Sequence, residues 1–389
     1  MKLCFDCETS ILNKGNPYSK GARLISYSYR REDTPTLFDY FKELNFLTDL
    51  RSELAKARLL IGFNIKFDLA HIGRHGLRPR EGCRIFDCQI AEFIISGQKM
   101  AYPSLNECLA KYGQEQKDDK IAEYWKAGID TEFIPEDELR NYNNWDVDLT
   151  YHLYLKQWEV MSEKQRKLCL VMGLDLLVLQ EMEENGVKFD VELCKTKGIE
   201  TEVSLKEITE ELLRYSPTKD INLDSGQQLS CLLYGGKFEV DYITEEQTTY
   251  KSGPKKGERY VKNIHNEIVF ECPRLFEPLP KSETKLKKKL GDEEIAIYVT
   301  NEDTLKQLKA KSKLQKQIIE LLLKRAELAK LLDTYYGKLP AMLDKMEWGD
   351  YLHGQYNQSV AATGRLSSSN PNMQNFSGDV DKLLVSRYD

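Results

Sequence analysis

Several features that would define a class of protein are missing from this sequence of 389 residues. No stretch approaches the ~18 consecutive apolar residues that a membrane-spanning helix needs, so the sequence predicts no membrane segment. The chain reaches an acidic residue at Asp6 without a long apolar run, which argues against a secretory signal peptide. The glycine patterns of phosphate loops and dinucleotide-binding turns do not occur, so neither kind of nucleotide-binding fold has support.

The cysteines lack the pattern of a disulfide framework. There are nine, an odd number scattered along the chain, which is typical of a reducing compartment and predicts a cytoplasmic location (the host cytoplasm if the protein is viral). Cys4 and Cys7 form an isolated C-x-x-C pattern, and zinc is a weak alternative there because no second pair follows at suitable spacing. His71 and His75 lie four residues apart and are expected on a helix surface rather than at a metal.

An excess of positive charge is also missing. The chain has 56 Lys and Arg against 62 Asp and Glu, a formal net charge of -6, so overall charge gives no argument for nucleic-acid binding. The charge is uneven, however, because residues 251–290 hold 11 Lys and Arg against 5 Asp and Glu. That run is either a solvated loop or a strip that follows phosphates.

Residues 1–155 alternate between strand and helix patterns. Asp87 is well placed as the N-cap of the helix expected at residues 89–96. Because strands alternate with helices, the sequence predicts an α/β domain. The strands are expected at residues 2–7, 23–29, 58–63 and 85–86, and the helices at 46–57, 67–75, 89–96, 104–112 and 136–157.

From residue 156 the pattern becomes mainly helical, with a predicted helix end at Asn185-Gly186. Residues 240–300 have poor periodicity and predict a loop-rich insertion with a few short strands. A long amphipathic helical segment is expected from about residue 300 to residue 336. The sequence therefore predicts three domains, at residues 1–155, 156–340 and 341–389.

Acidic residues gather in three segments of the first predicted domain. Asp6 and Glu8 end the first strand, where a period of two places both on one face. Asp68 follows the apolar run at residues 58–63, where it is either a helix cap or part of a crevice at the strand end. Tyr142 and Asp146 are four residues apart on a predicted helix and share a face, whereas Asp148 points elsewhere.

Four carboxylates from three segments would repel one another strongly unless cations neutralise them. Hard oxygen ligands favour Mg²⁺ or Mn²⁺. Two such ions ~3.5–4 Å apart suit the in-line hydrolysis of phosphodiesters, and the Tyr142 phenol could orient the attacking water.

The chain carries D-x-E at residues 6–8, then N-x-x-F-D at 64–68, then Y-x-x-x-D at 142–146. These three motifs in this order resemble the DEDD superfamily of 3′–5′ exonucleases, in its tyrosine-bearing branch. The resemblance implies an RNase H-like domain, a mixed sheet flanked by helices, with two Mg²⁺ or Mn²⁺ ions at the site. It further implies that Asp6, Glu8, Asp68 and Asp146 hold the metals and that Tyr142 positions the nucleophilic water. Leu12 and Asn64 match positions where the superfamily contacts the 3′-terminal nucleotide of DNA.

The rest of the chain resembles the family A, DNA polymerase I-like, DNA polymerases. Residues 181–190 and 221–229 are similar to the helical thumb of that family, and residues 325–330 and 363–375 to the approach to its palm. The match is poorest at 240–300, where the chain is most similar to phage members. The resemblance implies contacts with primer-template DNA from Arg365, Gln374 and Asn375.

The resemblance ends before the first catalytic aspartate of the palm, so the palm is expected to be incomplete and the chain not to polymerise DNA alone. We therefore expect the proofreading exonuclease part of a split or truncated polymerase. The alternatives are a DNA-binding subunit that completes a polymerase with a second polypeptide carrying palm and fingers, or a stand-alone exonuclease. A processivity or replisome partner is a further expectation for residues 240–300.

Overall fold

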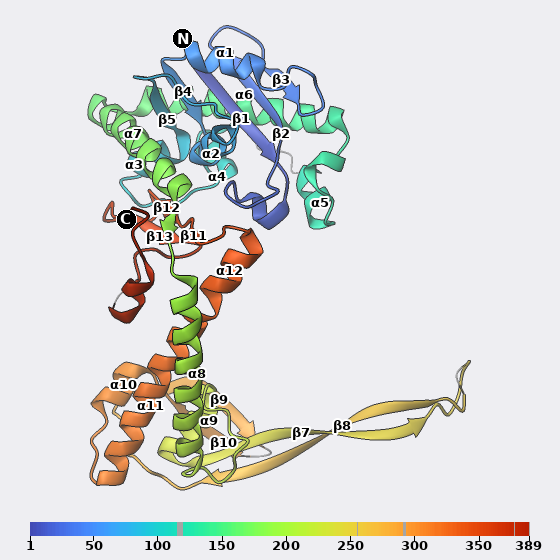
Figure 1. Ribbon diagram of the computed structural model, residues 1–389, viewed down its shortest axis with the longest axis vertical. Helices are drawn as coiled ribbons and strands as arrows, with labels where there is room; N and C mark the ends of the chain where they lie inside the picture. Colours follow the sequence, from blue (N-terminus) through green and yellow to red (C-terminus); the bar gives the residue numbers. More distant parts are fainter. Residues whose placement is uncertain (115–119, 255, 291–292, 377, 389) are drawn as a thin grey trace. The chain divides into compact units, whose positions relative to one another are not determined.

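The computed structural model describes residues 1–114, 120–254, 256–290, 293–376 and 378–388 (Figure 1). The chain divides into two compact units. The first consists of Met1–Val191 and Leu339–Asp389, and the second of Glu192–Lys338. The first compact unit combines parts of all three domains predicted from the sequence. The predicted boundaries at residues 155 and 340 rest on resemblance to other proteins rather than on compactness, so they stay a prediction.

The first unit is built on a mixed five-stranded sheet with the order β3-β2-β1-β4-β5. The central strand β1 is parallel to β4 and antiparallel to β2, and β4 is parallel to β5. The carboxyl ends of β1, β4 and β5 therefore lie at the same edge of the sheet. The strands are β1 (Lys2–Thr9), β2 (Leu24–Arg31), β3 (Leu37–Tyr40), β4 (Leu59–Gly62) and β5 (Arg84–Asp87).

Helices flank this sheet, so the predicted α/β architecture is confirmed (Figure 1). Side chains such as Leu3, Ile61 and Phe86 are fully buried between the sheet and the helices. The helices are α1 (Thr48–Lys56), α2 (Lys66–Gly73), α3 (Cys88–Ile95), α4 (Leu105–Lys111), α5 (Lys120–Lys126), α6 (Glu136–Val160) and α7 (Glu163–Asn185).

Two helix ends follow the expected chemistry. The Asp87 carboxylate accepts hydrogen bonds from the backbone N–H groups of Gln89 and Ile90, which confirms the predicted cap of α3. Helix α7 ends at Asn185, and Gly186 follows with a φ of 61°, a conformation that glycine adopts readily.

Residues after Leu339 return to the first unit. Helix α12 (Lys338–Met346) leads into β11 (Tyr351–Leu352), which pairs with β6 (Val187–Lys188). The next strands, β12 (Gln355–Asn357) and β13 (Ser367–Ser369), pair with each other.

The second unit has its own apolar core. Leu232, Tyr234, Phe238, Phe276 and Leu322 are buried in it. The predicted helical segment from residue 300 to residue 336 is confirmed in outline, with a break at residues 308–312. Its helices are α8 (Val191–Leu213, which begins in the first unit), α9 (Gly226–Tyr234), α10 (Glu302–Gln307) and α11 (Lys313–Leu331).

The expectation of a loop-rich insertion at residues 240–300 is wrong. The segment forms two antiparallel ribbons, β7 (Gly236–Thr249) with β8 (Arg259–Cys272) and β9 (Glu283–Leu290) with β10 (Glu293–Tyr298). Strands β7 and β8 are 14 residues long and exposed on both faces for much of their length. Alternation of apolar and polar residues is weak in such strands because neither face packs against a core.

Three features considered in the sequence can be compared with the structure: membrane-spanning helices, disulfide bonds and the position of His71. None of the described helices combines the length and apolarity that a bilayer crossing requires. Among the described residues the cysteines form no disulfide bond. The surface position expected for His71 is wrong: its side chain is 1% exposed, and Nε2 lies 2.9 Å from the carbonyl oxygen of Gly15.

Candidate active site

The site begins at the carboxyl end of β1. This strand extends through Thr9, so Asp6 and Glu8 both lie within it and their side chains share a face of the sheet. Glu8 is 7% exposed, and Asp6 is partly buried. Two carboxylates are thereby held close together on a rigid central strand.

Helix α6 brings a third carboxylate to this point because it packs against β1 and β2. Asp146 on α6 is 5% exposed. One carboxylate oxygen from each of Asp6, Glu8 and Asp146 can be chosen so that all three lie within 4.8 Å of one another. Residues separated by more than a hundred positions therefore converge on one small volume.

Asp68 on α2 adds a fourth carboxylate beside them. It is 3% exposed, and its Oδ1 accepts a hydrogen bond of 3.0 Å from the backbone N–H of Cys7 in β1. Burial, followed by the negative charge of Asp6, raises the pKa of the Asp68 carboxyl well above its usual range, and Glu8 adds to this. The Cys7 hydrogen bond opposes the rise without cancelling it.

This donor set fits hard divalent cations. All four groups are carboxylates, the ligands that Mg²⁺ and Mn²⁺ prefer, and no thiolate or imidazole belongs to the cluster of Asp6, Glu8 and Asp146. The raised pKa of Asp68 shows that ionising every carboxylate is costly without a counter-charge. A bound cation would relieve that cost.

Tyr142 lies one helical turn before Asp146 on α6. It is 9% exposed, and its ring packs edge-on against Trp125 at a centroid distance of 6.1 Å. Tyr142 and Asp146 both line a cavity of about 410 Å³, together with Trp145 and Glu138. The cavity therefore opens directly beside the carboxylates and offers room for a ligand.

Asn143 belongs to the site although the sequence reasoning did not single it out. It is fully buried, and its Nδ2 donates a hydrogen bond of 2.8 Å to Asp6 Oδ2. The signal was its position three residues before Asp146, which places it on the same side of α6. Asp148 points elsewhere as expected, toward Arg30 and Thr36.

The other predicted site residues are not members of the carboxylate cluster. Leu12 is 45% exposed in a short 3₁₀ turn after β1. Asn64, two residues before α2 and with a φ of 52°, donates its backbone N–H to Asp87 Oδ1 at 3.2 Å. Arg365, Gln374 and Asn375 are exposed in the C-terminal segment of the first unit.

Comparison with known proteins shows that this chain is similar in sequence to DNA polymerases. Residues 273–383 match the sequence model of DNA polymerase family A, a segment outside the carboxylate cluster. DNA polymerase I of Borreliella burgdorferi is 27% identical over 318 residues, which is 81% of this chain and 28% of that protein. DNA polymerase I of Helicobacter pylori is 25% identical over 353 residues, which is 90% of this chain and 32% of that protein.

A solved structure has a similar fold. It is the polymerase domain of Pol1 from M. smegmatis in complex with DNA primer-template and dNTP, with a TM-score of 0.62 and 16% sequence identity. The match covers 98% of this chain and 53% of that one. The chain spans about a quarter to a third of the length of the curated relatives that it matches.

Proposed function

This chain is related in sequence to the family A DNA polymerases, and we propose that it is a 3′–5′ exonuclease that removes nucleotides from DNA ends. The observation that carries the proposal is the convergence of Asp6, Glu8 and Asp146 within 4.8 Å, with buried Asp68 beside them. The proposed domain is the RNase H-like exonuclease of a polymerase, in the proofreading role.

Asp6, Glu8, Asp68 and Asp146 would hold two Mg²⁺ or Mn²⁺ ions. Bound there, the ions would supply Lewis-acid stabilisation of the charge that develops on the phosphodiester and on the leaving 3′ oxygen. The protein itself fixes the orientation of these ligands. Asn143 Nδ2 donates a hydrogen bond to Asp6 Oδ2, and the backbone N–H of Cys7 donates one to Asp68 Oδ1. Such supporting contacts keep carboxylates oriented before any ion binds.

Tyr142 is the group that would position the attacking water. Its phenol lines the 410 Å³ cavity with Asp146, and Trp125 restrains its ring. A phenolic hydroxyl both donates and accepts hydrogen bonds, so it can hold and orient a water molecule. Leu12 and Asn64 are proposed to contact the terminal nucleotide.

A second candidate function is the binding of primer-template DNA. It is favoured by the family A match at residues 273–383 and by the exposed side chains of Arg365, Gln374 and Asn375. In this role the chain would complete a polymerase with a second polypeptide. The β7–β8 ribbon, with Ile243, Val261 and Ile268 exposed, is the surface that we propose for a replisome partner.

The decisive experiment for the exonuclease follows mononucleotides released from a single-stranded, 3′-labelled DNA oligonucleotide. With Mg²⁺ the wild type should release them, and chelation of the metal should stop the reaction. Asp6→Ala and Asp146→Asn should each lower the rate by at least about a hundredfold, because each removes a ligand for the ions that stabilise the transition state.

Asp148→Asn is the matched control. It removes a carboxylate from the same helix, but one that contacts Arg30 and Thr36 instead of the cluster, so the rate should change less than about twofold. Binding of Mn²⁺, measured by electron paramagnetic resonance, should be weakened by Asp146→Asn and unaffected by Asp148→Asn. Equal rates for wild type and Asp6→Ala would overturn the proposal.

A further inference from the structure

A groove runs along α7 on the first unit, away from the carboxylates. Leu170, Leu174, Leu177 and Glu181 lie along one side of this helix, because their spacings of four, three and four residues return to the same face. Two hollows of about 650 and 370 Å³ adjoin this side of α7. Both are lined by Arg80, Gly82 and Arg84, so the two hollows adjoin at these residues, and we call them together the α7 groove.

The smaller hollow is lined by positive charge, although the chain as a whole is acidic. It is lined by Arg58, Arg80 and Arg84 and contains no acidic residue. The backbone N–H of Arg84 donates to the carbonyl oxygen of Arg58 at 3.0 Å, so the beginnings of β4 and β5 hold two of these arginines side by side. All three side chains are exposed.

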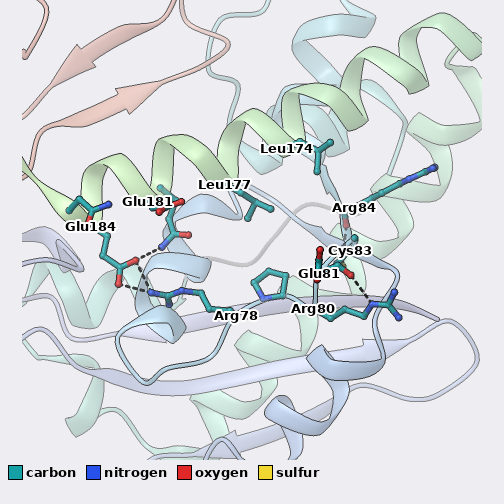
Figure 2. Close-up of a pocket in the computed structure, with 13 residues that line it drawn as sticks. Arg78, Arg80, Glu81, Cys83, Arg84, Leu174, Leu177, Glu181 and Glu184 are labelled. Atoms are coloured by element: carbon teal, nitrogen blue, oxygen red, sulfur yellow. Dashed lines mark hydrogen bonds and ion pairs between the residues drawn. The ribbon is translucent and has the colours of Figure 1, made fainter.

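These three guanidinium groups have no ion pair within the described part of the chain, whereas Arg78 in the same groove does. Arg78 binds both carboxylate oxygens of Glu184, at 2.6 and 2.7 Å (Figure 2). Among the residues that the structure describes, the one hydrogen bond of these three side chains runs from Arg80 Nε to the carbonyl oxygen of Glu81, at 3.2 Å. A planar guanidinium without a partner is well suited to bind a carboxylate or a phosphate with two hydrogen bonds.

The larger hollow combines apolar side chains with charged side chains of both signs. Figure 2 shows Leu174 and Leu177 of α7 above the segment that carries Arg80 and Arg84. Leu174 is 48% exposed there. Glu81, Glu181 and Glu184 offset the three arginines of this hollow, so a strand of nucleic acid, charged at every phosphate, would meet like charges along it.

We propose that the α7 groove binds an acidic peptide segment with apolar side chains. The acidic residues of the peptide would pair with Arg58, Arg80 and Arg84, and its apolar side chains would cover Leu174 and Leu177. The arginines lie where β4 and β5 begin, whereas the carboxylate cluster lies where the parallel strands end. The groove is therefore separate from the proposed exonuclease site and does not depend on it.

Fluorescence polarisation with the full chain tests this proposal. The probe is a labelled peptide that begins with a run of aspartates and ends in alternating leucine and alanine. The double variant Arg80→Gln/Arg84→Gln should raise Kd at least about tenfold, because it removes two charge-assisted pairs. Leu174→Gln should raise Kd several-fold through the loss of apolar contact.

Arg51→Gln, at an exposed arginine of α1, removes charge elsewhere on the same unit and should change Kd less than about twofold. Unchanged thermal melting will establish that the groove variants fold. No binding of the peptide, or equal binding by the double variant, would overturn the proposal. Tighter binding of a labelled thymidine oligonucleotide that is lost in the double variant would also overturn it, in favour of nucleic acid.

Discussion

Single side chains set the electrostatics of the carboxylate cluster. Asp68 is almost fully buried beside two other carboxylates, and its pKa is raised for that reason. The same group accepts the Cys7 N–H, a hydrogen bond that fixes its direction. The site therefore has carboxylates oriented in advance, at a cost in stability that a bound cation would remove.

Tyr142→Phe tests the proposed role of the phenol. The ring and its contact with Trp125 remain, so the free energy of unfolding should change little, whereas the nuclease rate should fall about tenfold to a hundredfold. The Mg²⁺ concentration for half-maximal rate should stay the same. Tyr151→Phe on the same helix is the control. An equal loss of rate in both variants would contradict the proposal that the Tyr142 phenol positions the attacking water.

His71→Gln tests how the free energy of unfolding depends on pH. Burial lowers the pKa of His71 from 6.5 to about 4. Between these values the unfolded chain binds a proton that the folded chain does not, so the free energy of unfolding falls as pH drops from 6.5 toward 4, by about 3 kcal/mol from this group. Glutamine can still donate to the Gly15 carbonyl oxygen but does not titrate.

Urea unfolding of both proteins at pH 7 and near pH 4.5 will measure that difference. Wild type should lose more stability on acidification than His71→Gln. His152→Gln, which changes an exposed histidine of α6, should behave like wild type. Parallel losses in wild type and His71→Gln would show that His71 is not the group responsible.

Among the secondary-structure elements, α7 packs against β5 and approaches it closely at Gly173. A Cβ built on Gly173 would lie 2.3 Å from the carbonyl oxygen of Ile85 in β5, a distance that no ordinary packing allows. The helix can approach the strand this closely because residue 173 has no side chain.

Gly173→Ala should therefore lower the free energy of unfolding by about 1–3 kcal/mol, in spite of the higher helix propensity of alanine. Gly198→Ala in α8 is the matched control. Its Cβ would lie 3.4 Å from Tyr336 Cβ, so the gain in helix propensity should leave stability equal or slightly raised. Chemical denaturation will distinguish the two, and a neutral Gly173→Ala would mean that α7 can shift away from β5.

At the scale of the whole molecule, the two units have separate apolar cores. The core of the first contains residues of the sheet and of α6 and α7, and the core of the second contains residues of α9 and α11, of the start of β7 and of the end of β8. The carboxylate cluster belongs entirely to the first unit. A cation should therefore stabilise one unit and leave the other unchanged.

Calorimetry should record two unfolding transitions. Mg²⁺ should raise one of them, by an amount that grows with its concentration and corresponds to about 2.7 kcal/mol at a hundred times Kd. Asp146→Asn should abolish that shift. Leu322→Ala, in the core of the second unit, should lower the other transition through a loss of about 2–5 kcal/mol. A single transition that both changes move would contradict two independent cores.

The α/β order of the first unit, the caps at Asp87 and Gly186, and the identity of the acidic residues could all be predicted from the sequence. These features are local, since period, capping and strand-end position follow from neighbours in the chain. The length of β7 and β8 could not be predicted, because strands exposed on both faces carry little alternation.

The contacts between distant parts of the chain became visible only in the folded protein. The fold brought Asp146 to Asp6 and Glu8, gave Asn143 its contact with Asp6, and buried His71 against Gly15. It also placed Arg58 beside Arg84, since parallel strands align residues that are far apart in the chain. Such contacts depend on sheet order and helix packing, which no local pattern in the sequence specifies.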